Sequence, residues 1–115
     1  MNAAPPRDPT VPGCQVGELF RLLSRAHMLD VLQVVTHEDG PVRFVDIQRR
    51  LGISPNTLSN RLKALLQAGL ATRTVYPEVP PRVDYEATDK ARALRCVFRS
   101  LNEWATEHDL RPVPA

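Results

Sequence analysis

A capped helix with one apolar face and one acid-free polar face dominates the middle of the chain. Ser54 is a good N-cap residue, and Pro55 suits the first helical position, where its missing N–H group costs nothing. The apolar side chains recur at the spacing of one helix face, at Leu58, Leu62, Leu65 and Leu66. The opposite side carries only neutral polar and basic residues, namely Asn56, Thr57, Asn60, Arg61, Lys63 and Gln67. A polar face without acidic residues predicts a negatively charged partner that accepts and donates hydrogen bonds.

A short helix and a glycine turn precede this capped helix. Residues 45–51 show a helical apolar spacing, and Gly52 follows as a residue that takes positive φ without strain. Ile53 is the one large apolar residue of the turn, and residues 42–44 predict a short strand before the first helix. A short helix, a glycine turn and a capped second helix together predict a helix-turn-helix.

A hairpin is predicted directly after the second helix. Gly69 ends that helix, and residues 70–76 and 82–87 are rich in β-branched side chains, which favours two strands. The inward-facing residues of the second strand are predicted to be Val83, Tyr85 and Ala87. The loop at residues 77–81 contains three prolines, which remove hydrogen-bond donors and stiffen the backbone. A hairpin in this place predicts a wing.

The last helical segment carries more apolar surface than a small winged core can cover. Residues 16–38 predict two helices with a break at 24–27, and Thr88 is predicted to cap a single helix over 89–108. The apolar stripe of this last helix runs for about five turns, so we favour a homodimer interface over simple core cover. The expected interface residues are Val16, Leu19, Phe20, Phe98, Leu101 and Trp104. If the dimer binds DNA through its two helix-turn-helix units, its two-fold symmetry would require a pseudo-palindromic operator. The half-sites of this operator would lie about 10 bp, or a multiple, apart.

Positive charge gathers in the middle of the chain, although the whole protein carries only +2. Residues 41–82 contain seven basic and two acidic side chains, whereas residues 1–40 and 83–115 are each net negative. A local basic surface on a nearly neutral protein suits contact with phosphate groups at one place.

The 115-residue chain has the composition of one globular domain and shows no catalytic or metal-binding pattern. Cys14 and Cys96 make neither a disulfide scaffold nor a zinc motif, and the three histidines are far apart. No apolar N-terminal segment predicts a signal peptide, and no run is long enough to span a membrane. We therefore expect a cytoplasmic protein with no membrane partner, no cofactor and no metal, and not an enzyme.

Prolines mark the expected limits of the ordered domain. Residues 1–13 contain four prolines and few large apolar side chains, which predicts a flexible arm, and residues 110–115 predict a tail. Residues 14–109 are expected to form one domain of the mainly α (α+β) class. Its predicted architecture is a winged helix-turn-helix with N- and C-terminal dimerisation helices.

Two stretches of the sequence resemble a known family. Residues 53–70 read I-S-P-N-T-L-S-N-R-L-K-A-L-L-Q-A-G-L, and residues 75–91 read V-Y-P-E-V-P-P-R-V-D-Y-E-A-T-D-K-A. Together with G-C-x-V at 13–16 and E-W at 103–104, these stretches resemble the HxlR family of winged helix-turn-helix transcriptional regulators. The wing sequence is the most specific part of this resemblance, which covers residues 14–108.

The resemblance implies a homodimer, with the first and last helices at its interface, that binds operator DNA as a repressor or an activator. Some family members sense electrophiles or oxidants through a cysteine near the N-terminus, which is where Cys14 lies. Two interpretations stay open for Cys14: a small residue packed at the dimer seam, or a sensor at a helix start, where a thiolate is stabilised. The chain departs from the family's G-G-K-W stretch at residues 24–27, and it carries Ala91 where glycine is usual.

The expected DNA contacts come from the capped helix, the wing and the strand before the helix-turn-helix. Asparagine pairs with adenine and arginine with guanine through two hydrogen bonds. Base contacts are therefore assigned to the first half of the helix, to Asn56, Thr57, Asn60 and Arg61. The helix start at Ser54 and Pro55 is expected to hold a phosphate. Contacts with the DNA backbone are assigned to Arg43, Lys63, Arg73, Tyr76 and Arg82, and the minor groove stays open as an alternative for Arg73 and Arg82. The roles of Arg49, Arg50 and Gln67 stay undecided.

Two further interpretations of the function stay open. One is a winged helix that contacts another protein, and the other is a regulator with a small-molecule or electrophile effector bound between its first and last helices. DNA binding is distinguished by salt, because log affinity falls against log salt with a slope of roughly −0.9 per phosphate contact. A module used only for protein contact would show no operator binding even at low salt.

Overall fold

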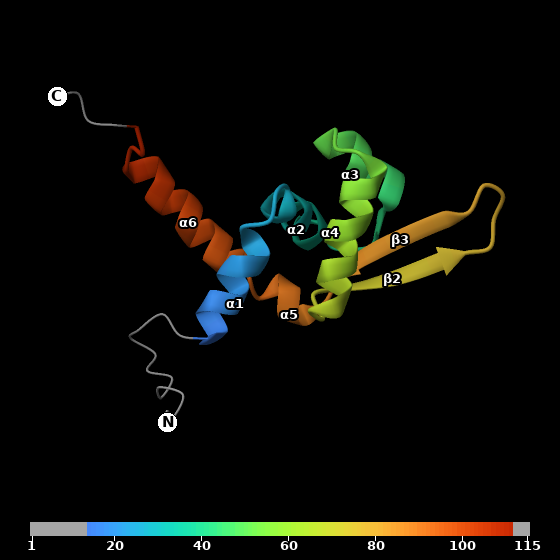
Figure 1. Ribbon diagram of the computed structural model, residues 1–115, viewed down its shortest axis with the longest axis horizontal. Helices are drawn as coiled ribbons and strands as arrows, with labels where there is room; N and C mark the ends of the chain where they lie inside the picture. The colour runs from blue at the N-terminus through green and yellow to red at the C-terminus, as the bar shows by residue number, and fades with distance from the viewer. Residues whose placement is uncertain (1–13, 112–115) are drawn as a thin grey trace.

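The computed structural model describes residues 14–111, with side chains from Val16 onward. The helices are α1 (Cys14–Leu23), α2 (Met28–His37), α3 (Phe44–Leu51), α4 (Pro55–Gln67), α5 (Asp89–Arg92) and α6 (Arg95–Glu107) (Figure 1). The strands are β1 (Val42–Arg43), β2 (Ala71–Tyr76) and β3 (Arg82–Ala87). The winged helix-turn-helix fold is confirmed. The predicted arm at 1–13 and the end of the predicted tail lie outside the described residues.

The three strands form one antiparallel sheet in the order β1-β3-β2. Val42 pairs with Tyr85, and the long β2–β3 ladder runs from Ala71 opposite Ala87 to Tyr76 opposite Arg82. Because β1 has only two residues, the outer half of the hairpin has no third strand beside it. This outer half projects from the body of the molecule as the predicted wing (Figure 1).

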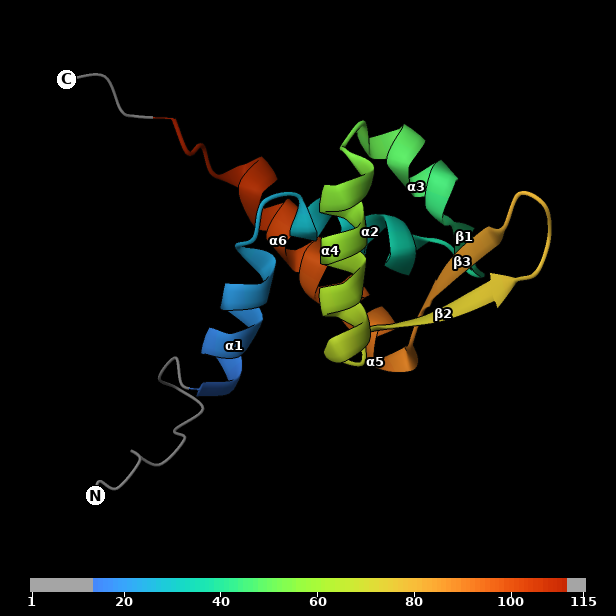
Figure 2. The same ribbon diagram turned by 45° about the vertical axis from the view of Figure 1, so that its right-hand side comes forward.

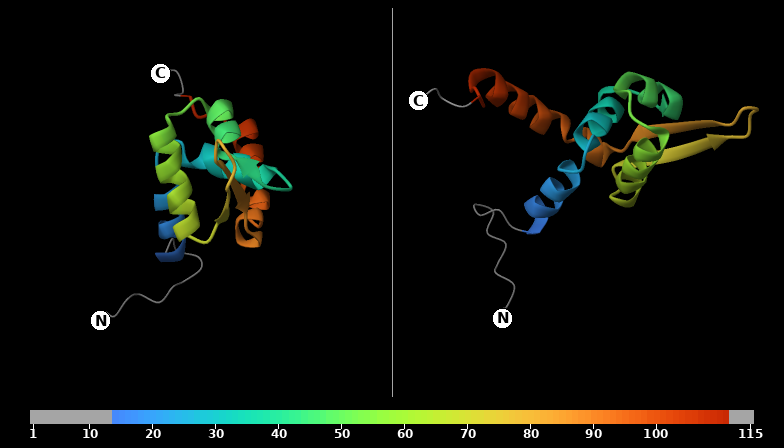
Figure 3. Two further views of the ribbon diagram at one scale, coloured as in Figure 1. Left: turned by 90° about the vertical axis from the view of Figure 1, so that its right-hand side faces the viewer. Right: turned by 45° about the horizontal axis from the view of Figure 1, so that its top comes forward.

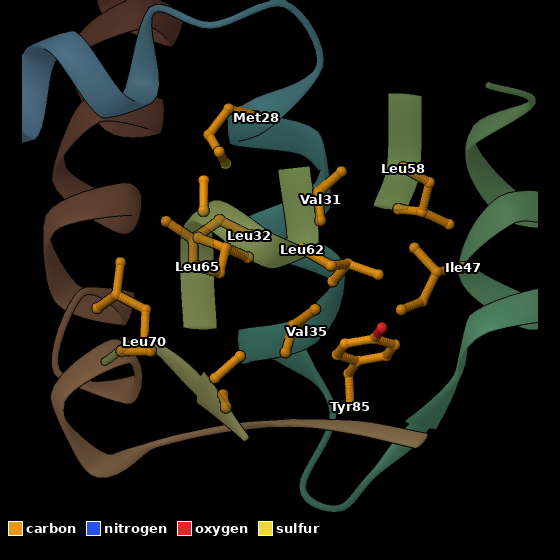
Figure 4. Packing of buried hydrophobic residues seen from close by; sticks show 14 of the residues in the cluster. Met28, Val31, Leu32, Val35, Ile47, Leu58, Leu62, Leu65, Leu70 and Tyr85 are labelled. Atoms are coloured by element: carbon orange, nitrogen blue, oxygen red, sulfur yellow. The ribbon is translucent and has the colours of Figure 1, made fainter. Parts of the chain in front are cut away.

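The core lies between α2, α3, α4 and the inner face of the sheet. Its fully buried side chains include Leu32, Ile47, Leu58, Leu62 and Leu65. Figure 4 shows these side chains converging from α2, α3 and α4, with Tyr85 closing the group from β3. Each fully buried aliphatic side chain contributes roughly 1.5–3 kcal/mol relative to its exposed state, so this cluster fixes how α4 sits on the sheet.

The turn of the helix-turn-helix has the predicted chemistry. Gly52 adopts a left-handed conformation with φ of 64°, and its N–H donates to the carbonyl of Gln48 at 2.8 Å. Ile53 is buried beneath the turn. The Ser54 hydroxyl accepts a hydrogen bond from the Thr57 N–H at 3.1 Å, which confirms Ser54 as the cap of α4.

Two clasps hold the other parts of α4 to the fold. At its C-terminal end, the Lys90 ammonium donates to the Ala68 carbonyl at 2.7 Å, and the Thr88 hydroxyl donates to the Gly69 carbonyl at 2.8 Å. At the middle of the helix, Arg61 donates from Nε to the Ala26 carbonyl in the α1–α2 turn at 2.7 Å. Residues far apart in the sequence therefore set the orientation of α4. Figure 2 shows α4 with the α1–α2 turn and α5 beside it.

The prediction of one helix over 89–108 was wrong. Helix α5 ends at Arg92 and α6 starts at Arg95, because the Leu94 N–H bonds to the carbonyl of Ala91, three residues back, and tightens the chain there. Arg95 then donates to the Thr36 carbonyl at 2.6 Å and anchors the first turn of α6 to the end of α2. The short α5 stays against the core, where Ala91 is buried, whereas α6 leaves it.

The break predicted between the first two helices is confirmed, since α1 ends at Leu23 and α2 begins at Met28. His27 is the N-cap residue of α2 and adopts a left-handed conformation with φ of 66°. A non-glycine residue seldom takes this conformation, and here it turns the chain sharply between the two helices. Figure 3 shows α1 and α6 on the side of the molecule away from the hairpin.

Candidate nucleic-acid interface

The outward side of α4 is polar, exposed and free of acidic side chains. Its inner side is held by Leu58, Leu62 and Leu65, which are all fully buried. The outer side exposes Asn56, Ser59, Asn60, Lys63 and Gln67 to solvent. No hydrogen bond among the described residues uses the amides of Asn56 and Asn60, so both remain available to a ligand. The predicted base-contacting asparagines therefore share one open surface.

The other two predicted base contacts on α4 already have partners in the protein. Thr57 is half-buried, and its hydroxyl accepts from the Ser54 hydroxyl at 2.9 Å, so both side chains serve the cap. Arg61 is half-buried, and its Nε is engaged by the Ala26 carbonyl. Only the terminal amino groups of the Arg61 guanidinium are left for a further contact. Pro55 is exposed at the first helical position, as predicted from the sequence.

A polar cluster, formed by Arg43, Tyr76, Arg82 and Asp84, covers the outer face of the sheet at the base of the wing. Arg82 donates to Asp84 through two hydrogen bonds, Nε to Oδ1 at 3.1 Å and Nη2 to Oδ2 at 3.0 Å. The same guanidinium lies over the Tyr76 ring, with its central carbon 4.6 Å from the ring centroid. Arg43 is the cross-strand partner of Asp84. The cluster therefore joins all three strands on the face opposite the core.

Electrostatics keep the Asp84–Arg82 pair ionised. The hydrogen bonds from the Arg82 guanidinium lower the pKa of the Asp84 carboxyl, and they outweigh the opposing effect of desolvation; the charges of Arg82 and Arg43 add to the lowering. The hydrogen bond to Asp84 in turn raises the pKa of Arg82. Only 3 % of Asp84 is exposed, and such a buried carboxylate is tolerated because it is paired.

Sequence reasoning did not identify Asp84. The predicted inward positions Val83, Tyr85 and Ala87 are buried or half-buried, but Asp84 on the opposite face is buried too. The central position of β3, between β1 and β2, explains this burial, since neighbouring strands flank Asp84 on both sides. An arginine two residues before an aspartate on a strand places both on one face, and that spacing was the available signal.

The remaining basic residues considered for contact with the DNA backbone differ in whether they already form ion pairs within the protein. Arg73 on β2 and Lys63 on α4 are exposed and form no ion pair among residues 14–111. Arg49 pairs with Asp46 at 3.4 Å, and Arg50 pairs with Glu38 at 3.5 Å. Both undecided arginines of α3 therefore have acidic neighbours, and exposed pairs of this kind are weak.

The apolar sides of α1 and α6 are open in this structure. Phe20 is 59 % exposed, Leu101 53 % and Trp104 51 %, and Val16 is also exposed. Leu19 and Phe98 are half-buried, and Phe98 packs against the core. Helix α6 has no buried residue at all. These exposed side chains belong to the set that the sequence assigned to a dimer interface.

The structure describes the side chain of only one of the two cysteines. Cys14 is the first residue of α1, but its side chain lies outside the described part of the chain. Cys96 is exposed on α6, and its thiol donates to the Ala93 carbonyl at 3.3 Å. No cluster of three metal-binding side chains occurs within residues 14–111. The helices over the same residues are too short and too polar to cross a bilayer.

A hollow of about 580 Å³ lies between α1, the end of α4 and the α5–α6 junction. Its apolar lining includes Leu19, Leu22 and Leu94, and its basic lining includes Arg25 and Lys90. This is the region in which the sequence left open an effector site between the first and last helices.

The structure thus defines the class of the protein as a winged helix-turn-helix, with an open polar face on its second helix and a charged wing base. The family model described as HxlR-like helix-turn-helix matches residues 26–111, and the chain belongs to this family. This confirms the family resemblance identified from residues 53–70 and 75–91.

The known relatives of the chain are transcriptional regulators. It is 44 % identical over 72 residues to the HTH-type transcriptional regulator BH0655 of Halalkalibacterium halodurans, a match that covers 62 % of this chain and 64 % of that protein. It is 41 % identical over 70 residues to YodB of Bacillus subtilis, covering 60 % of this chain and 62 % of YodB. The matches to these curated relatives thus span less than two thirds of their length.

Solved structures of YodB from B. subtilis share the fold over a greater length. The reduced form has a TM-score of 0.73 and 33 % identity, covering 86 % of this chain and 96 % of that chain. The quinone-bound form has a TM-score of 0.72 and 32 % identity, covering 82 % and 97 % respectively.

Proposed function

We propose that this protein is a sequence-specific DNA-binding transcriptional regulator that binds a pseudo-palindromic operator as a homodimer. The observation that carries the proposal is the open outer face of α4, where Asn56, Asn60 and Lys63 are exposed with no acidic residue among them. This face lies beside a wing in a chain whose family consists of helix-turn-helix regulators. A protein surface of hydrogen-bonding amides and cations is complementary to base edges and phosphates.

The proposed roles follow the exposure of each side chain. Asn56 and Asn60 read base edges, with Thr57 and Arg61 contributing only the groups that their internal bonds leave free. The start of α4 at Ser54 and Pro55 receives a phosphate, because unbonded N–H groups and the positive end of the helix dipole meet there. The other exposed or wing residues contact the DNA backbone, namely Arg43, Lys63, Arg73, Tyr76 and Arg82.

The homodimer is proposed from the apolar sides of α1 and α6. Phe20, Leu101 and Trp104 are half-exposed or more, and a second copy related by a two-fold axis would cover them. Large aromatic side chains at the centre of an interface supply much of the binding energy. The two copies would present two α4 helices to half-sites about 10 bp, or a multiple, apart.

Selection from a random pool of DNA duplexes tests the proposal directly. We expect an enriched inverted repeat, and an affinity that falls steeply with salt, with a log–log slope of roughly −0.9 for each phosphate contact. If no sequence is enriched and no duplex is retained at low salt, the chain is a winged helix for protein contact instead.

We propose Cys14 as the site of an oxidant or electrophile response. Support comes from its position at the start of α1 and from the similarity to YodB, of which a quinone-bound structure is known. Replacement by serine should leave DNA binding intact and abolish its loss on treatment with diamide. An unchanged diamide response in the variant would assign Cys14 to packing alone. The matched control is Cys96→Ser, which should respond as the wild type does.

A further inference from the structure

The burial of Asp84 calls for a reason, because its side chain lies on the sheet face that points away from the core. Its strand neighbours on this face are Arg43 on β1 and Thr74 on β2, and Arg82 precedes it on β3. A carboxylate placed among these residues loses water on both sides. Removing an ion from water is costly unless a well-formed partner compensates, and Arg82 is that partner.

The Arg82 guanidinium is fixed on two sides at once. Its Nε and Nη2 edge is bound to both oxygens of Asp84, and its plane lies over the ring of Tyr76, the cross-strand partner of Arg82. Two parallel hydrogen bonds and a stacked ring leave the guanidinium little rotational freedom. The Nη1 group has no bonded partner within residues 14–111, so one edge stays available.

Arg82 also stands where its orientation matters. It is the first residue of β3 and lies next to the proline-rich loop, at the point where the hairpin has passed the end of β1. An unrestrained arginine side chain there would sample many rotamers and would lose that freedom on binding DNA. Fixing it in the free protein removes this entropic cost from the binding step.

We infer that Asp84 is a positioning residue for DNA binding: it holds Arg82 against Tyr76 so that the free guanidinium edge meets a backbone phosphate beside the wing. The inference rests on the proposed function. Asp84 is then expected to raise the affinity for DNA, although it is acidic and DNA is a polyanion. The negative charge of Asp84 considered alone would predict the opposite, a lower affinity.

The test is Asp84→Asn, which keeps the side-chain shape and removes one negative charge from the protein. Charge alone predicts tighter binding to the selected duplex. Loss of positioning predicts roughly tenfold weaker binding, because a charge-assisted contact is no longer preformed. The matched control is Glu78→Gln in the wing loop, which makes the same charge change and should bind at least as tightly as the wild type.

A second variant keeps the test decisive if Asp84→Asn does not fold. Arg82→Lys retains the charge at the wing, but a lysine ammonium cannot form the two parallel hydrogen bonds. We expect this variant to bind roughly tenfold more weakly as well, with the folded fraction checked by thermal unfolding. If Arg82 acted only as a point charge, lysine would retain the wild-type affinity.

The salt dependence separates positioning from a general structural role. Asp84→Asn should make the log–log slope shallower by roughly 0.9, the share of one phosphate contact, on both the selected and a scrambled duplex. In an Arg82→Gln background the same substitution should have no further effect on binding, since the two residues act as a unit. Additive losses, or an unchanged slope, would overturn the inference.

The outcomes for the two proposals are distinct. If the wild type binds DNA and Asp84→Asn binds as tightly or more tightly, the positioning role is wrong and the DNA-binding function stands. If the wild type binds no duplex at low salt, both are overturned. If the wild type binds and both variants lose affinity with the Glu78 control intact, Asp84 positions Arg82 for binding.

Discussion

Helices α4 and α6 have the same length, 13 residues, and both are amphipathic, yet they use their apolar sides in opposite ways. Helix α4 buries Leu58, Leu62 and Leu65 in the core of its own chain. Helix α6 has no fully buried residue: Phe98 packs half-buried against the core, and Leu101 and Trp104 are left in solvent. An apolar stripe therefore does not distinguish a helix that packs in the core of its own chain from one that leaves most of its apolar side exposed.

The way in which each helix is held also determines which of its surfaces can bind a ligand or a partner. Because the core fixes α4 from within, the outer face of α4 carries no structural duty and can meet a ligand. Helix α6 is held mainly at its start, where Arg95 reaches the Thr36 carbonyl. We propose that a second copy of the chain covers the rest of its apolar side.

The largest expected effect is a loss of stability caused by a substitution on the inner side of α4. Leu62→Ala should lower the free energy of unfolding by about 2–5 kcal/mol, because it opens a cavity in a fully buried cluster. Urea denaturation measures the change. Leu101→Ala on α6 is the matched control and should cost far less at protein concentrations where the dimer dissociates. Equal losses in the two variants would remove the distinction between the helices.

The second effect is on the apolar side of α6. Trp104→Ala should weaken self-association by about 2 kcal/mol, or about thirtyfold, if this aromatic side chain is central to the interface. Sedimentation equilibrium measures the dissociation constant. Val79→Ala, at the fully exposed tip of the wing, should leave it unchanged. A monomeric wild type would show that the partner of α6 is not a second copy.

The third effect is on the outer face of α4, and it concerns specificity alone. Asn60→Ala should lose about 1–3 kcal/mol of discrimination at one base pair. Its free energy of unfolding should change by no more than about 0.5 kcal/mol, since the side chain is exposed. Competition among single-base variants of the operator measures the first quantity. Lys63→Gln, which removes a proposed phosphate contact, should instead weaken all sequences alike.

The smallest effects concern the arginine that tethers each helix. Arg61 on α4 and Arg95 on α6 each donate from Nε to a distant carbonyl, at 2.7 and 2.6 Å. Replacement by lysine keeps the charge but loses this geometry, and should cost about 1 kcal/mol of stability in each case. The two variants should differ in function: Arg61→Lys should affect DNA binding, and Arg95→Lys self-association. The reverse pattern would mean that the tethers do not act on their own helices.

The helix-turn-helix was predictable because its signals are local. Gly52 supplies a left-handed turn, Ser54 caps α4, and prolines limit the wing, and each signal depends on residues within one turn of the chain. The break between α5 and α6 was not predictable in this way. The apolar spacing continues through Leu94, and the start of α6 is anchored by the hydrogen bond from Arg95 to Thr36, a residue distant in the sequence.

The residues of the candidate site also differ in whether local sequence signals or distant contacts determine their surroundings. The exposure of Asn56 and Asn60 followed from helical periodicity, which the sequence shows directly. The internal partners of Arg61 and Arg82 depend on how the α1–α2 turn and the central strand pack against them. Polarity alone could not distinguish an arginine that is free to meet DNA from one that is bound within the protein.

The clasps around α4 have a consequence for how such proteins diversify. Lys90, Thr88 and Arg61 hold the helix through backbone carbonyls, and no hydrogen bond among residues 14–111 uses the amides of Asn56 and Asn60. Mutations at the outward positions can therefore accumulate after gene duplication without a loss of folding. Under the proposed function, copies of this gene can acquire new operators one base pair at a time, while the scaffold that presents α4 is inherited unchanged.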